Sequence, residues 1–138
     1  MRVAKTALLV LIVVAVGAAV WHYLYVPWKY RQDTRALATL LESCTSSEFS
    51  IREFLSGATS SYTIEGRSGD LCRVQFSMLG GERLVCAFPV EDLPGIAGGY
   101  RRLAESVDLF GNVSFSYDSA DPDPLTVALS SETCAVER

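Results

Sequence analysis

The sequence predicts an α+β protein, in which a single N-terminal transmembrane helix precedes a small disulfide-supported domain with helices packed on an antiparallel sheet of about five strands. Three observations lead to this prediction. Residues 6–26 form a run of 21 positions without an acidic residue, Lys or Arg. All four cysteines follow that run. Beyond it, segments with helical spacing of apolar residues are joined to segments in which apolar and polar residues alternate.

The uncharged segment 6–26 has the length of one bilayer crossing. A helix rises about 1.5 Å per residue, so the segment covers roughly 31 Å, close to the thickness of the hydrocarbon core. Residues 1–5 then form a cytoplasmic N-terminus. Residues 27–31 form an interfacial linker, because aromatic and cationic side chains prefer the headgroup level. The predicted membrane-interface residues are Trp21, Tyr23, Tyr25, Trp28, Lys29, Tyr30 and Arg31.

A cleaved signal peptide is the alternative interpretation of the same segment. Arg2 and Lys5 fit a charged n-region, residues 7–14 an apolar h-region, and residues 16–19 a small-residue cleavage site. The apolar run continues past that site to Val26, which favours an uncleaved signal anchor. In both interpretations the C-terminal part of the chain crosses the membrane.

The four cysteines indicate the compartment of the domain at residues 32–138. An even number of cysteines in about a hundred residues is typical of disulfide-stabilised domains in oxidising spaces. We therefore expect an inner-membrane protein whose domain faces the periplasm or the exterior. The alternative is a set of buried cytosolic thiols. The cysteines are Cys44, Cys72, Cys86 and Cys134.

Charge separates along the chain. Every acidic residue follows Arg31, and no Lys follows Lys29. The region after Arg31 therefore carries 16 acidic residues against eight arginines. An acidic domain is unsuited to phosphate backbones, which excludes nucleic acid as a partner.

The first half of the domain is predicted to be helical and then to change to strands. Residues 30–44 form a helix with apolar residues on one face. A capping box at Thr45 or Ser50 predicts a second short helix that ends at Gly57. Strands follow at 62–65, 72–78 and 84–88, separated by a turn at 66–70 and a second turn at Gly80–Gly81.

The second half is predicted to contain one helical segment and two strands. The helical segment covers residues 90–108, although its early glycines and Pro94 weaken it. The strands cover 113–117 and 125–129. The Asp- and Pro-rich residues between them form a loop rather than a Ca²⁺ site.

The hairpin between the two central strands constrains the cysteine pairing. A three-residue loop at 79–81 places Val74 opposite Cys86 and leaves Cys72 a diagonal neighbour of Cys86, about 7–8 Å away. A bulge or a shifted turn brings Cys72 and Cys86 into direct opposition. We therefore prefer the pairing Cys72–Cys86 with Cys44–Cys134, and leave the other two connectivities open.

The sequence contains no constellation that predicts catalysis or metal binding. The only histidine, His22, lies in the apolar segment, so the domain lacks Ser-His, Cys-His and histidine metal sites. Ala18-x-x-x-His22 resembles the motif with which light-harvesting antenna polypeptides bind a tetrapyrrole. The resemblance covers five residues, and an interfacial histidine is the preferred interpretation, so we expect no cofactor.

These observations predict a non-enzymatic protein that acts by protein–protein interaction, as an accessory or assembly subunit of a membrane complex. The candidate partner surfaces are one sheet face and the glycine-rich segment 94–102. Their residues are Arg73, Gln75, Tyr100, Arg101 and Arg102. A ligand-binding or inhibitory periplasmic domain is the alternative, with a cavity lined by Tyr62, Tyr100 or Tyr117.

Overall fold

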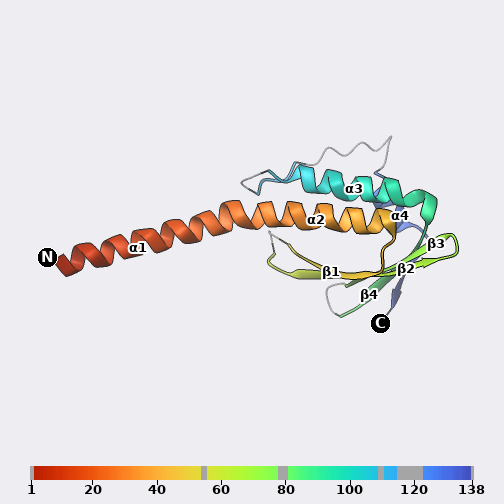
Figure 1. Ribbon diagram of the computed structural model, residues 1–138, viewed down its shortest axis with the longest axis horizontal. Helices are drawn as coiled ribbons and strands as arrows, with labels where there is room; N and C mark the ends of the chain where they lie inside the picture. The colour runs from red at the N-terminus through yellow and green to blue at the C-terminus, as the bar shows by residue number, and fades with distance from the viewer. Residues whose placement is uncertain (1, 54–55, 78–80, 109–110, 115–122, 138) are drawn as a thin grey trace.

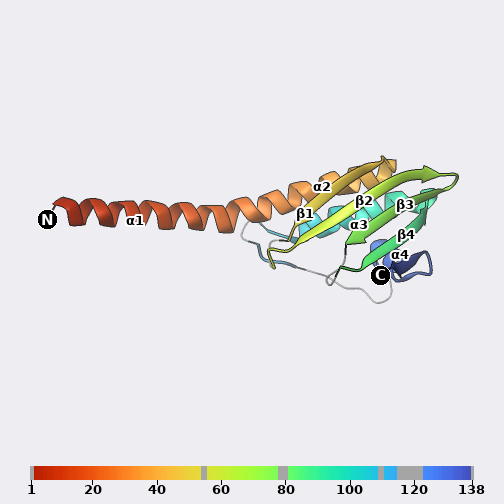
Figure 2. The same ribbon diagram turned by 90° about the horizontal axis from the view of Figure 1, so that it is seen from below.

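The chain begins with one long helical run that leads into the core of the C-terminal domain (Figure 1). The computed structural model describes residues 2–53, 56–77, 81–108, 111–114 and 123–137. The run consists of α1 (Arg2–Val20), a π-helical segment η1 (Trp21–Tyr25) and α2 (Val26–Ser43). Helix α1 projects away from the domain, whereas α2 lies over the sheet (Figures 1 and 2).

Pro27 accounts for the π-helical segment. A proline has no backbone N–H, and its ring collides with the carbonyl four residues earlier, here that of Tyr23. The helical turn widens by one residue and the helix does not break, because the Val26 N–H donates to the carbonyl of Trp21, five residues earlier. Pro27 is buried in the first turn of α2. Residues 27–31, predicted as an interfacial linker, are therefore helical and continuous with both neighbours.

The predicted helix at 30–44 is confirmed and forms most of α2. Leu37, Ala38 and Leu41 are completely buried on its domain-facing side. The helix ends at Cys44, which adopts the left-handed conformation with φ 48° and donates its N–H to the carbonyls of Leu40 and Leu41. This C-terminal position usually favours glycine, so a structural reason is needed for a cysteine there.

Five antiparallel strands form one sheet in which every strand pairs with the next in sequence. The predicted α+β fold is therefore confirmed. Figure 2 shows the strands on one side of the domain with α2 and α3 behind them, so the helices cover a single face of the sheet. The strands are β1 (Ser47–Arg52), β2 (Thr59–Ser68), β3 (Leu71–Ser77), β4 (Arg83–Pro89) and β5 (Cys134–Glu137).

The short helix predicted at 45–57 is wrong, because β1 occupies most of this segment. Phe49 and Ile51 alternate with polar residues and lie opposite Tyr62 and Ser60 of β2. A capping box is a local signal, and here the burial of Ile51 against the helices outweighs it. Phe54 and Leu55, in the last part of the predicted helix, lie outside the described residues.

The strand predicted at 125–129 is also wrong, since this segment forms α4 (Pro124–Ser130). The side chain of Asp123 caps it by accepting from the N–H groups of Leu125 and Thr126. An Asp followed by a Pro is a helix-start signal that the alternating residues obscured. In the other predicted strand, Val113 forms an isolated bridge with Val107, and residues 115–117 lie outside the described residues.

The predicted helical segment 90–108 is observed as a short 3-10 turn η2 (Val90–Asp92) and α3 (Leu93–Ser106). Its glycines allow close helix packing. A Cβ at Gly99 would lie 2.4 Å from the Cβ of Leu125 on α4 and 3.1 Å from a carboxylate oxygen of Asp123. Helix α4 therefore sits on the surface that Gly99 leaves open.

All four cysteines form disulfides, as expected, but the preferred pairing is wrong. The bonds are Cys44–Cys72 and Cys86–Cys134. Val74 lies opposite Cys86 and Phe88 opposite Cys72, so no bulge or shifted turn brings Cys72 to Cys86. Cys44 ends α2 against β3, while Cys134 lies directly opposite Cys86 at the sheet edge. The covalent bond to Cys72 explains a cysteine at the left-handed end of α2.

Peptide mapping without reduction tests this connectivity, because trypsin places each cysteine on a separate peptide. We expect the peptide 36–52 to be linked to 68–73, and 84–101 to be linked to 103–138, with no free thiol. A link between 68–73 and 84–101 would contradict the observed register. The reduced digest serves as the control for peptide assignment.

Two neighbouring glycines of α3 provide a matched test of the contact between α3 and α4. Gly99→Ala should lower the free energy of unfolding by about 1–3 kcal/mol, because a Cβ cannot rotate away and α4 must move. Gly98→Ala meets only the end of Arg102 at 3.6 Å and should stabilise the helix by about 0.5–1 kcal/mol. Denaturant titration of the full-length protein measures both changes, and equal effects would contradict the packing.

Candidate interaction surfaces

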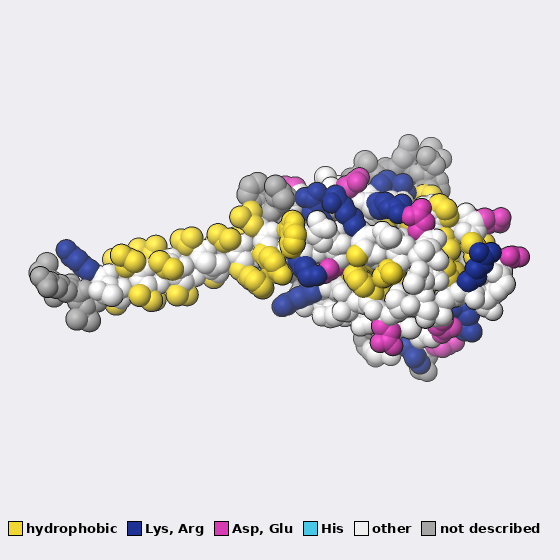
Figure 3. Space-filling model, viewed as in Figure 1, with side chains coloured by type: hydrophobic (Ala, Val, Ile, Leu, Met, Phe, Trp, Pro, Cys, Tyr) yellow, Lys and Arg dark blue, Asp and Glu magenta, His cyan; other side chains and the backbone are white. Residues whose placement is uncertain are grey.

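The N-terminal helix has the properties of a membrane anchor. The helical run Lys5–Ser43 has 39 residues. Its most apolar stretch is long and apolar enough to cross a membrane, and no part of that stretch is buried against the domain. Apolar side chains from Leu8 to Leu24 are 43–66% exposed. Figure 3 shows them along the rod, with cationic side chains where it meets the domain.

The predicted membrane-interface residues lie at the junction of the rod and the domain. The rings of Trp21 and Tyr25 stack at 4.2 Å, and Tyr25 contacts Trp28 at 5.8 Å. Lys29 pairs with Asp33 one helical turn later. Tyr30 instead packs against the domain core, and Arg31 is half-buried. The junction therefore combines exposed aromatic rings with side chains that belong to the domain.

His22 lies within the π-helical segment and is exposed. Its ring meets Tyr23 edge-on at 5.2 Å. Across the described residues, no group of three or more His, Cys, Asp or Glu side chains is arranged to hold a metal ion.

The candidate surface on the open sheet face consists of Arg73, Gln75 and a third residue that sequence analysis missed. Glu65 receives a hydrogen bond from Gln75 and pairs with Arg73 at 3.4 Å. The strand pairing shifts between Ile64 and Gly66, which places Glu65 at a β-bulge. A glycine inside a strand is a signal for such a bulge, so Gly66 marked this position in the sequence.

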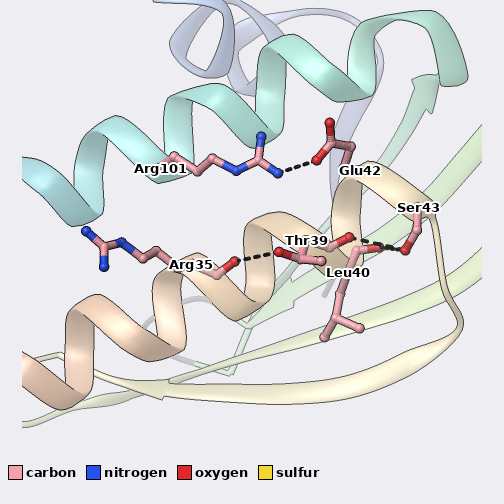
Figure 4. A network of polar contacts seen from close by, with 6 residues as sticks. All are labelled: Arg35, Thr39, Leu40, Glu42, Ser43 and Arg101. Carbon is pink, nitrogen blue, oxygen red and sulfur yellow. Dashed lines mark hydrogen bonds and ion pairs between the residues drawn. The ribbon is translucent and has the colours of Figure 1, made fainter.

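The second candidate surface, at 94–102, is divided by the fold. Tyr100 is only 5% exposed and belongs to the core, so it does not contribute to a contact surface. Arg101 reaches from α3 to Glu42 on α2, as Figure 4 shows. Arg102 pairs with Asp123, the cap of α4. Both arginines therefore tie α3 to a neighbouring helix, and only their remaining exposed surface is available to a partner.

The tyrosines predicted to line a cavity form an aromatic cluster instead. The Tyr62 ring meets Phe76 at 5.5 Å and Tyr100 at 6.4 Å, both edge-on. Burial raises the pKa of Tyr62 to about 12 and also raises the pKa of Tyr100. These phenols stay protonated in the folded domain at neutral pH. Tyr117 lies outside the described residues.

A groove of about 550 Å³ lies elsewhere, between β4, α3 and α4. We call it the distal groove, because the start of α3 and α4 lie at the end of the domain away from the rod (Figures 1 and 2). Its apolar wall includes Phe88, Ile96 and Val127, and its edge carries Glu91 and Asp92. Sequence analysis missed this groove because it assigned residues 125–129 to a strand.

Comparison of the chain with protein-family models, curated proteins and solved structures gives no match. The class of protein is therefore defined by the fold. It is a disulfide-bonded α+β domain carried on an N-terminal helix that is long and apolar enough to cross a membrane.

The buried tyrosine cluster predicts a loss of stability at alkaline pH. Tyr62 keeps its proton up to about pH 12 in the folded domain, whereas an unfolded tyrosine ionises near pH 10. The contribution of the buried Tyr62 to the free energy of unfolding should therefore be fully present below pH 10 and be lost between pH 10 and 12. Phenolate absorbance should show late ionisation that disappears in denaturant and is reduced in Tyr62→Phe. Simultaneous ionisation of all tyrosines in the folded protein would contradict this expectation.

Proposed function

We propose that this chain is a non-enzymatic, single-pass envelope protein whose domain binds a protein partner as an accessory or assembly subunit of a membrane complex. The observation that carries the proposal is the uninterrupted helix from the apolar segment into the domain core. Helix α2 continues the rod, and it also buries Leu37, Ala38 and Leu41 in the domain core. The domain therefore has a defined orientation relative to the rod.

A fixed orientation favours a partner in the same membrane. An anchor that only retains a domain needs no more than a flexible linker, which leaves the domain free to rotate. A helix that is part of the core instead holds each domain surface at one height and one angle. Confinement to the membrane also raises the effective concentration of the domain near its partner.

The proposed location is the inner membrane, with the domain in the periplasm or at the exterior. Its support is chemical: two disulfides join residues 28 and 48 positions apart. Disulfides persist in oxidising compartments and are reduced in most cytosols. The acidic character of the domain also suits a protein that stands off an anionic bilayer.

A ligand-binding or inhibitory periplasmic domain is the second candidate function, and the distal groove favours it. Its volume of about 550 Å³ falls within the range of small-molecule sites. This candidate predicts a bound small molecule and activity without a membrane complex. It also remains compatible with release of the domain by cleavage of the N-terminal segment.

Purification of the tagged protein in mild detergent tests the proposal. The full-length protein should co-purify with a membrane complex, and a version that starts at Gln32 should lose or weaken the association. Because that truncation removes Pro27 and Tyr30, its fold should be checked by circular dichroism and by its disulfide map. If both forms purify alone, the assembly function is wrong.

Two insertions between Tyr25 and Val26 separate orientation from simple tethering. A flexible Gly-Ser insertion breaks the helix and keeps the anchor, so it should reduce co-purification. A matched insertion of four alanines keeps the helix, lengthens it by about 6 Å and rotates the domain by about 40°, so it should preserve more of the association. Equal co-purification of both insertion variants would show that orientation is not required.

A further inference from the structure

We propose that the distal groove binds a segment of the partner protein that carries an Arg or Lys beside apolar side chains. This inference rests on the proposed function and deepens it, because it names the contact site and the chemistry of the partner. Three properties of the groove lead to it: two carboxylates without a partner among the described residues, a partly exposed apolar wall and a position away from the N-terminal rod.

The unpaired carboxylates are Glu91 and Asp92. Both are exposed at the edge of the groove, and neither has a hydrogen-bond or ion-pair partner among the described residues. Three other acidic side chains near the helices and the sheet face do pair with an arginine. Glu42, Glu65 and Asp123 pair with Arg101, Arg73 and Arg102. The groove therefore presents negative charge that the described part of the domain does not neutralise.

The position of these carboxylates before α3 explains part of their presence. Acidic residues near a helix N-terminus are stabilised by the helix dipole. That interaction leaves the carboxylate oxygens in solvent, where they remain able to accept from a guanidinium or ammonium group. A cationic side chain is the complementary partner.

The apolar wall gives the groove its second specificity. Phe88 and Ile96 are each 1% exposed and form its packed base, whereas Val127 is 48% exposed. An apolar side chain seated there removes Val127 from water, which favours binding by roughly 25 cal/mol for each Å² buried. The groove has a volume of about 550 Å³ and is partly open to solvent, which suits a side chain or a short peptide segment.

The location of the groove excludes the lipid bilayer as its ligand. Its lining elements, the start of α3 and α4, lie toward the end of the domain away from the N-terminal rod (Figures 1 and 2). When α1 spans the membrane, this end is farthest from the lipid headgroups. An occupant must come from outside the bilayer, which is where a partner of an anchored accessory subunit presents its own domain.

Peptide binding to the full-length protein tests this site. The protein is placed in nanodiscs of neutral phosphatidylcholine, because a cationic probe binds anionic lipid. The probe is a fluorescent peptide of alternating Leu and Arg residues, compared with one in which Glu replaces Arg. We expect binding of the Leu-Arg peptide, weakened by salt, and no binding of the Leu-Glu peptide.

Matched variants locate the binding. Glu91→Gln combined with Asp92→Asn should weaken binding about tenfold, whereas Glu48→Gln with Glu105→Gln removes the same charge elsewhere and should leave it unchanged. Val127→Ser should weaken binding about fivefold, whereas Val136→Ser alters a valine that is 53% exposed on β5 and should not. Circular dichroism confirms that each variant is folded.

The proposal is overturned if the Leu-Arg peptide does not bind, if both peptides bind equally, or if either groove variant behaves like its matched control. Purification of the same variants separates this failure from failure of the proposed function. A membrane complex that co-purifies equally with wild type and groove variants supports the proposed function and removes the groove as its contact site. Absence of any complex removes the proposed function itself.

Discussion

The structure depends on α2 being shared between two parts of the protein. Its first residues continue the apolar rod, and Leu37 and Leu41 form the centre of the domain core. The π-helical turn before Pro27 allows this continuity, because it absorbs the missing N–H and the bulk of the proline ring without a break. A break in the helix at that position would leave the domain connected to the rod by a flexible hinge. The observed helix makes the apolar rod continuous with a structural element of the domain.

Two disulfides secure the ends of the segments that this helix organises. Cys44 fixes the end of α2 to the middle of the sheet, and Cys134 fixes the last strand to β4. Loops of this size are expected to contribute about 3–4 kcal/mol each in the chain-entropy model. Such stabilisation matters in a small domain, which buries a limited fraction of its surface. A third close contact involves Gly99, whose missing side chain allows α4 to approach α3. This approach creates one wall of the distal groove.

The candidate surfaces differ in how far the sequence revealed them. Arg73 and Gln75 alternate with core residues, so their exposure on the open sheet face follows from strand geometry alone. Tyr100 lies next to two arginines in the sequence, yet the helix turns its ring into the core while Arg101 points to α2. The distal groove left no local pattern, because its walls come from β4, α3 and α4. Only the packing of these three elements with η2 brings its carboxylates and apolar side chains together.

The sequence by itself determined the α+β class, the long apolar N-terminal helix, the two central strands, and the participation of every cysteine in a disulfide. These features depend on composition and on periodicity within short segments, which the chain carries locally. Tertiary structure decided whether the segments around Phe49 and Leu125 become strand or helix, since each has signals for both. It also decided the disulfide partners, because a pairing needs the distance between elements that are separate in sequence. That distance is fixed only when α2 and β5 take their places on the sheet.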